Sequence, residues 1–265
     1  MKYAKLEDNS RLVKENLIKH QTKSKTRINK YLSEQGILSR RKADQYIKDN
    51  RIKINDKVAL LGDIVYSTDK VYLDNKLIKE TNDQNIYIAL NKPKGIISTS
   101  NPKIKNNIIE FMNYPERIFM IGRLDKETSG LILLTNDGDI VNKILRANYE
   151  HEKEYIVTVN KPLTKNFIKE IEKGVTIYNP VAKRHQKTAP AKAKIINSNT
   201  FSLIITQGLN RQIRRMVSAL NYDVIDLKRI RVININLDNL KEGYYRYLTK
   251  DELLKLNIII NKTIS

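Results

Sequence analysis

Residues 122–138 have the sequence GRLDKETSGLILLTNDG, which places a polar loop between two apolar runs. The runs are residues 118–121 and 131–134, and short apolar runs that end at Gly, Asn or Asp are typical of buried strands joined by a turn. Two such strands would hold the carboxylate of Asp125 in one position, as a scaffold holds a reactive group. An Asp in a glycine-bounded turn is also ordinary turn chemistry, so this loop alone leaves both roles open.

The chain carries a strong positive charge. Its 265 residues include 49 Lys and Arg against 29 Asp and Glu, a formal net charge of +20. Such an excess predicts a polyanionic partner, with a membrane surface as the competing class. No apolar run approaches the ~20 residues of a spanning helix, and the basic N-terminus lacks the apolar core of a signal peptide. We therefore expect a cytoplasmic protein without a membrane partner, and we expect a monomer.

Metal and thiol chemistry find no support in the sequence. There is no cysteine, and the three histidines, His20, His151 and His185, lie far apart without ligand spacing. Disulfides, a thiol nucleophile and a zinc-ribbon site are thereby excluded. There is also no phosphate-binding glycine loop, so we expect no metal site and no cofactor.

The N-terminal third divides into an arm and a compact module. Residues 1–25 show no core-forming period and predict either a flexible basic arm or an extension without a task. From Thr26, apolar residues recur at helical spacing up to Gly36, and Ser39 can cap a second helix. Short β-rich pieces follow, so residues 26–80 are expected to form a module of two helices and a few strands.

A larger domain is expected over residues 86–265, after a polar linker at 81–85. Residues 86–90 favour a strand, and residues 91–95 a turn that carries two cations and a proline. A short helix is expected over 139–146, a helix between Thr164 and Gly174, and strands over 154–159, 191–196 and 201–206. Strands that pair locally, with helices scattered between them, indicate an α+β domain.

Residues 207–220 fit an amphipathic helix. Its apolar stripe consists of Ile213, Met216, Val217 and Leu220. Arg211, Arg214 and Arg215 project from the other side, near a helix start where the dipole favours anions instead. This misfit suggests that the arginines bind a phosphate backbone or a carboxylate, with simple solvated basicity as the alternative.

Taken together, these segments resemble the RsuA/RluB/RluE/RluF family of ribosomal RNA pseudouridine synthases. The matching segments are residues 122–138, the 91–95 turn, Lys153-Glu154-Tyr155 and the Arg-rich stretch at 207–216. Residues 27–32, 39–44 and 52–55 resemble the S4 RNA-binding domain that precedes the catalytic domain in this family. The resemblance implies an α+β fold: an S4 module followed by a mixed, mainly antiparallel sheet with a central cleft.

The same resemblance implies roles for individual residues. Asp125 would be the catalytic carboxylate, and Arg214 its ion partner, which would keep it ionised at neutral pH. Tyr155 would stack on the target base, although an aromatic side chain in a strand is usually part of the core. Arg123 would enter the RNA stack beside the flipped nucleotide. Further RNA contacts are expected from Arg27, Lys30, Arg40, Arg41, Lys42, Lys92, Arg211, Gln212 and Arg215.

The implied reaction converts a uridine in RNA to pseudouridine without a cofactor. Residues 144–148, 151–155 and 207–212 look similar to the RluF type, which implies large-subunit (23S) ribosomal RNA and also a tRNA as substrates. One alternative is a synthase of the same family that acts on 16S ribosomal RNA or mainly on tRNA. Another is a non-catalytic RNA-binding assembly factor, against which the intact set of Asp125, Tyr155 and Arg214 argues.

Overall fold

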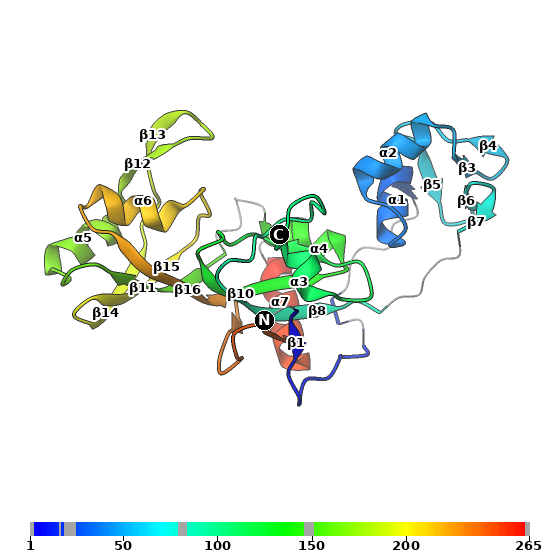
Figure 1. Ribbon diagram of the computed structural model, residues 1–265. Helices are drawn as coiled ribbons and strands as arrows, with labels where there is room; N and C mark the ends of the chain where they lie inside the picture. The colour runs from blue at the N-terminus through cyan, green and yellow to red at the C-terminus, as the bar shows by residue number, and fades with distance from the viewer. Residues whose placement is uncertain (1–2, 16, 19–24, 79–83, 146–150, 263–265) are drawn as a thin grey trace.

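The computed structural model describes residues 3–15, 17–18, 25–78, 84–145 and 151–262 (Figure 1). Most of the expected linker at 81–85 and residues 146–148 lie outside this range. No helix among the described residues is long and apolar enough to cross a membrane.

The N-terminal module consists of two helices and short antiparallel strands, as expected. Its elements are β2 (Lys25–Arg27), α1 (Ile28–Glu34), α2 (Arg40–Lys48), β3 (Ile52–Ile54), β4 (Lys57–Val58), β5 (Ile64–Tyr66), β6 (Val71–Leu73) and β7 (Lys76–Leu77). The side chain of Ser39 accepts a hydrogen bond from the Lys42 amide, which confirms the predicted cap of α2. Ile28, Leu32 and Ala43 are fully buried in a core that belongs to this module alone.

The larger domain is built on a ten-stranded sheet. Its main path is β1 (Lys5–Leu6), β18 (Tyr244–Tyr247), β8 (Tyr87–Lys92), β10 (Ser129–Thr135), β16 (Val224–Val232), β11 (Lys153–Val159), β15 (Thr200–Ile205) and β14 (Lys192–Asn197). Beside it, β9 (Phe119–Ile121) pairs with β10, and β17 (Ile235–Asn236) pairs with β16. Only the β1–β18 and β10–β16 pairs of the described sheet are parallel, so the expected mixed, mainly antiparallel sheet is confirmed.

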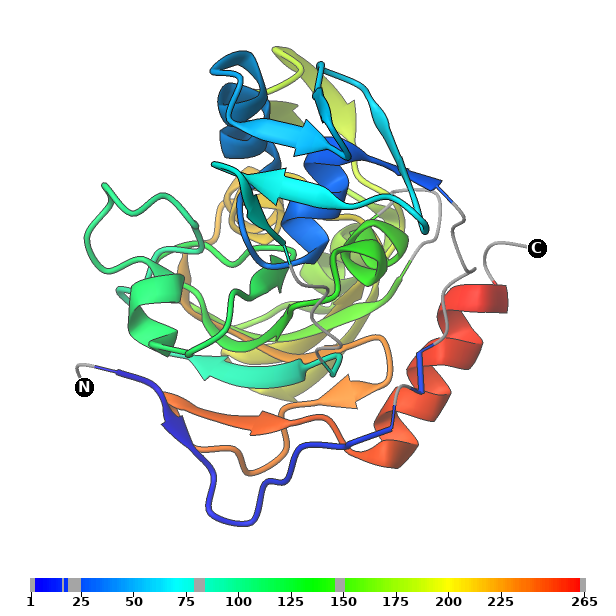
Figure 2. The same ribbon diagram turned by 90° about the vertical axis from the view of Figure 1, so that its right-hand side faces the viewer.

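Helices cover both faces of this sheet. One face packs against α3 (Ile108–Met112), α5 (Lys165–Lys173) and α6 (Gln212–Ala219). The other face packs against α4 (Gly138–Leu145) and α7 (Lys250–Lys262), which lies beside the N-terminal segment in Figure 2. A separate hairpin, β12 (Thr176–Asn179) and β13 (Arg184–Lys187), stands beside α6. We refer below to the α3–α5–α6 side as the first face.

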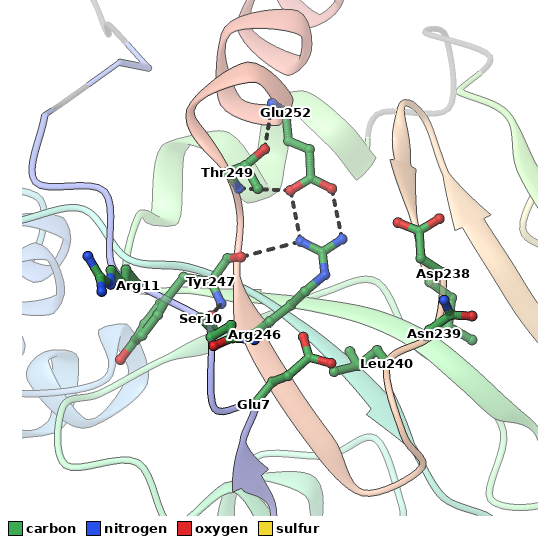
Figure 3. Close-up of a pocket in the computed structure, with 12 residues that line it drawn as sticks. Glu7, Ser10, Arg11, Asp238, Asn239, Leu240, Arg246, Tyr247, Thr249 and Glu252 are labelled. Carbon is green, nitrogen blue, oxygen red and sulfur yellow. Dashed lines mark hydrogen bonds and ion pairs between the residues drawn. The ribbon is translucent and has the colours of Figure 1, made fainter.

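The N-terminal segment corrects one prediction. Where it is described, it is not a flexible arm but part of the larger domain, since β1 pairs with β18 and Ile18 is 2% exposed. The hydroxyl of Ser10 also accepts a hydrogen bond from the Tyr247 amide, at the rim of a cavity of about 530 Å³ (Figure 3). The sequence lacks a helical or strand period here because the segment contributes isolated apolar side chains to a core that other elements form.

Polar contacts between described residues join the N-terminal module to the larger domain. The ammonium of Lys30 lies 2.5 Å from a carboxylate oxygen of Asp139, at the start of α4. The guanidinium of Arg117 donates a hydrogen bond to the carbonyl of Leu38. The module therefore docks on the larger domain through Lys30 of α1 and through the backbone of Leu38, which lies between α1 and α2.

Candidate active site

The loop that contains Asp125 connects β9 to β10, as the apolar runs predict. These strands pair antiparallel, with Leu133 opposite Ile121. Asp125 is half-buried, and its carbonyl accepts a hydrogen bond of 3.0 Å from the Thr128 amide, which closes the turn. The carboxylate is thus presented on a tight turn between two buried strands.

The backbone on either side of Asp125 is fixed from the 91–98 segment. The buried hydroxyl of Ser98 donates to the Leu124 carbonyl at 2.8 Å and accepts from the Leu124 amide at 3.2 Å. The amide of Gly95 donates to the Lys126 carbonyl at 2.9 Å. Because both neighbours of Asp125 are held, the carboxylate has little freedom to leave its position.

Arg214 comes from the first turn of α6 and reaches the same loop. Its Nη2 donates to the carbonyl of Glu127 at 2.9 Å, and its Nη1 donates to the carbonyl of Val224 at 3.4 Å. Burial lowers the pKa of Arg214, and Arg211 adds to this, whereas Asp125, Glu127 and Asp226 act in the opposite direction. In the described part of the chain, Arg214 and Asp125 do not form the predicted ion pair. The guanidinium of Arg214 is bonded to backbone carbonyls instead.

Four residues on adjacent strands form a buried row at the end of β10 that follows the Asp125 loop. Lys92 on β8 is in register with Gly130 on β10, Gly130 with Arg229 on β16, and Arg229 with Tyr155 on β11. All four are buried, with Lys92 at 0%, Arg229 at 3% and Tyr155 at 8% exposure. Their strand neighbours two residues away belong to the core of the first face, so this face carries the row. We call these residues the buried row.

Gly130 is the member of the row that cannot carry a side chain. Its φ is +100°, and a Cβ built on it would lie 2.2 Å from the carbonyl oxygen of Arg229. The close approach of β10 and β16 therefore depends on the absence of this one carbon atom.

Lys92 is not the exposed RNA contact that the sequence suggested. Its ammonium donates to the carbonyls of Pro93 and Ile96, and burial lowers the pKa of Lys92 to about 8. Residues 91 and 92 continue β8, so the predicted turn begins two residues later than expected. Lys92 instead stabilises the turn at residues 93–96 through these two hydrogen bonds. The negative charge of Asp125 acts on the Lys92 ammonium and opposes the lowering of its pKa.

The burial of Lys92 predicts a pH-dependent contribution to stability. The ordinary pKa of lysine lies near 10.5 and the folded-state value near 8, so between them the unfolded chain binds more protons. The free energy of unfolding of the wild type, relative to Lys92→Met, should therefore rise by on the order of 2 kcal/mol between about pH 7 and pH 10. Urea titrations across this range would measure it, with Lys103→Met as an exposed control. A difference that stays constant with pH would contradict the prediction.

The other predicted RNA contacts on α6 divide into exposed and buried groups. Arg211 is exposed, and Arg215 donates to the Tyr178 carbonyl and to the Asn210 side chain. Gln212 is 4% exposed, and its oxygen accepts from the Leu209 amide. Gln212 is therefore not the exposed RNA contact that the sequence predicted. It is a buried residue that stabilises the turn before α6.

The predicted contacts outside α6 are mostly at the surface. Exposed side chains are those of Arg27, Arg40, Arg41, Lys42 and Arg123. Lys30 is instead engaged with Asp139 of the larger domain and with Glu34 of its own helix. As long as the module is docked in this way, Lys30 is an interdomain contact.

Sequence reasoning did not single out Ser98 or Arg229. Ser98 follows an apolar pair in an irregular segment, where nothing local distinguishes it from an ordinary loop serine. Arg229 lies in residues 224–232, VIDLKRIRV, where polar and apolar side chains alternate except at Val224-Ile225 and Lys228-Arg229, so its strand could have been predicted. Its burial could not, because an Arg on such a strand is normally assigned to the solvent face.

With this geometry established, comparisons identify the class of protein. A family model described as RNA pseudouridylate synthase matches residues 86–219, and an S4 domain model matches residues 26–71. The fold and these matches define an RNA pseudouridine synthase, an isomerase with an N-terminal S4 domain. The chain belongs to the RsuA/RluB/RluF family of these enzymes.

Relatives agree with this assignment. The dual-specificity RNA pseudouridine synthase RluF of Salmonella typhi is 46% identical, over 92% of this chain and 83% of the relative. The ribosomal large subunit pseudouridine synthase B of Bacillus subtilis is 36% identical, over 88% and 96%. A crystal structure of a pseudouridylate synthase superposes with a TM-score of 0.63 at 30% identity, over 87% of this chain and 99% of that one.

Proposed function

We propose that this enzyme isomerises a specific uridine of large-subunit (23S) ribosomal RNA in the cytoplasm, and that a tRNA is a second substrate. The observation that supports this most is the 46% identity to a dual-specificity synthase over nine-tenths of the chain. The identity to the ribosomal small subunit pseudouridine synthase A of Haemophilus influenzae is lower, at 32%, which favours the large-subunit target over the small-subunit alternative. The net charge of +20 and the exposed arginines of the S4 domain suit a large folded RNA.

Asp125, Arg214 and Tyr155 are the residues to which we assign the chemistry. Asp125 acts on the nucleoside, Arg214 holds the Asp125 loop and supplies positive charge, and Tyr155 stacks against the uracil. Supporting this are the fixed turn around Asp125, the Arg214–Glu127 hydrogen bond and the place of Tyr155 at the end of the buried row. Flipping the target base out of RNA costs about a few kcal/mol, which stacking on Tyr155 would partly offset.

The reaction itself provides the test of the target. The C1′–N1 bond of the nucleoside breaks, a C1′–C5 bond forms, N1 gains a proton and the C5 hydrogen leaves to water. RNA labelled with tritium at C5 of uridine therefore releases tritium in proportion to product. We would measure release from protein-free 23S ribosomal RNA, 16S ribosomal RNA and bulk tRNA, each at the same uridine concentration.

Release from 23S RNA that stops near one equivalent per molecule, with none from 16S RNA, is the expected result. Release from tRNA in addition would support the second substrate. Release from 16S RNA alone would overturn the assigned target.

A further inference from the structure

Arg229 is a buried cation that the roles assigned so far do not use. It is 3% exposed, and its Nε donates to the carbonyl of Leu131 at 2.7 Å, which ties β16 to the strand that follows the Asp125 loop. Its Nη2 is buried without a hydrogen-bond partner. A buried donor without a partner is uncommon and costly, more so on a charged group, and therefore calls for an explanation.

The position of Arg229 points to the substrate as the missing partner. In the buried row it lies between Gly130, five residues after Asp125, and Tyr155, the proposed base platform. Gly130 contributes no side chain at this point, so Arg229 is the only member of the row between Lys92 and Tyr155 with polar atoms. Because Arg229 is the register partner of Tyr155 on the neighbouring strand, a base that stacks on Tyr155 lies next to the position of Arg229.

Other unpaired buried atoms occur nearby. The hydroxyl of Thr128, in the Asp125 loop, and the Nε of Arg214 are also buried without a partner in the described structure. Arg231, two residues after Arg229 on the same strand, shows the contrast. Its guanidinium is bonded to Glu154, Glu152 and the Ile233 carbonyl. Unpaired donors therefore also occur in the Asp125 loop and on α6, whereas the guanidinium of Arg231 on the same strand as Arg229 has hydrogen-bond partners.

We propose that Arg229 is a substrate-binding residue whose Nη2 donates a hydrogen bond to a carbonyl oxygen of the target uracil. Uracil offers two acceptors, O2 and O4, and both gain negative charge when the C1′–N1 bond breaks and the electron pair moves into the ring. A buried guanidinium is suited to that charge, because its planar donors are held in place and water cannot compete for them. This inference rests on the proposed uridine isomerisation.

The test replaces the acceptor as well as the donor. RNA would carry 2-thiouridine or 4-thiouridine at the target, because sulfur is a much weaker acceptor than oxygen. Pseudouridine formation would be followed by nucleoside chromatography for the wild type, Arg229→Gln, Arg229→Lys and the matched control Arg231→Gln. The uridine RNA is included for every protein, so that failure of the proposed function appears as no conversion of this RNA by the wild type.

If the proposal holds, one of the two thio substitutions slows pseudouridine formation by the wild type about tenfold. This is the rate loss expected when a hydrogen bond to a charged donor is weakened. In Arg229→Gln, which is already slow on uridine, the same substitution should have an effect of about twofold or less, since the two changes remove one interaction. Arg231→Gln should retain the full thio effect, and Arg229→Lys should recover part of the rate on uridine. The KM for RNA should change little, because docking is due to other residues.

Two results would overturn the proposal. One is a thio effect of the same size in Arg229→Gln as in the wild type, which would leave Arg229 with a purely structural role. The other is the absence of any thio effect in the wild type at either oxygen. Should Arg229→Gln fail to fold, Arg229→Met, which has a side chain of similar length and no hydrogen-bond donor, makes the same comparison with both thio substrates.

Discussion

Replacing Asp125 by asparagine should lower the rate of tritium release by more than about 1,000-fold, because the variant loses the carboxylate to which we assign the chemistry. The substitution keeps the size of the side chain and the backbone bonds to Ser98 and Gly95, so the fold should be unchanged. RNA binding should also persist, since docking depends on the S4 domain and the basic surface. The measurement is single-turnover release with enzyme in excess, together with an RNA-binding titration.

Glu116→Gln serves as the control for Asp125→Asn, because it removes an exposed carboxylate of the same domain. Its release rate should match that of the wild type. Activity retained by Asp125→Asn within about tenfold would mean that another carboxylate performs the reaction, since loss of a group that acts covalently costs far more.

The second large effect is expected on stability, from Gly130→Ala. A Cβ at this position would lie 2.2 Å from the Arg229 carbonyl oxygen and 2.7 Å from its nitrogen, so β10 and β16 would have to separate. Backbone atoms in the middle of a sheet cannot yield as a flexible side chain does. We expect a loss of about 3 kcal/mol or more in the free energy of unfolding, which adds overpacking to the strain of a positive φ.

Gly95→Ala separates these two causes. Gly95 has a similar φ of +88°, but a Cβ there would meet nothing within 4 Å. This variant should lose only about 1 kcal/mol, the cost of the conformation itself. Urea denaturation of both variants gives the comparison. Equal losses would show that the β10–β16 contact is not the source of the effect.

Much of the local structure follows from the sequence itself. The Asp125 loop between two buried strands, the caps at Ser39 and Thr164, and the apolar stripe of α6 appear where periodicity and capping residues place them. Such features depend on neighbours within a few residues, so a single sequence contains the information. The family could also be recognised from the sequence, because each of its motifs is a continuous stretch of residues.

The tertiary structure decided what is buried and what meets. Lys92 and Gln212 carry polar side chains in basic segments, which locally indicate exposure, yet both are enclosed. Residues 3–15 and 17–18 lack any period because their partners, β18 and the two cores, come from distant parts of the chain. The buried row joins positions 92, 130, 155 and 229, and only the register of four strands brings them together. Local patterns determine elements, whereas pairing between distant strands determines the site.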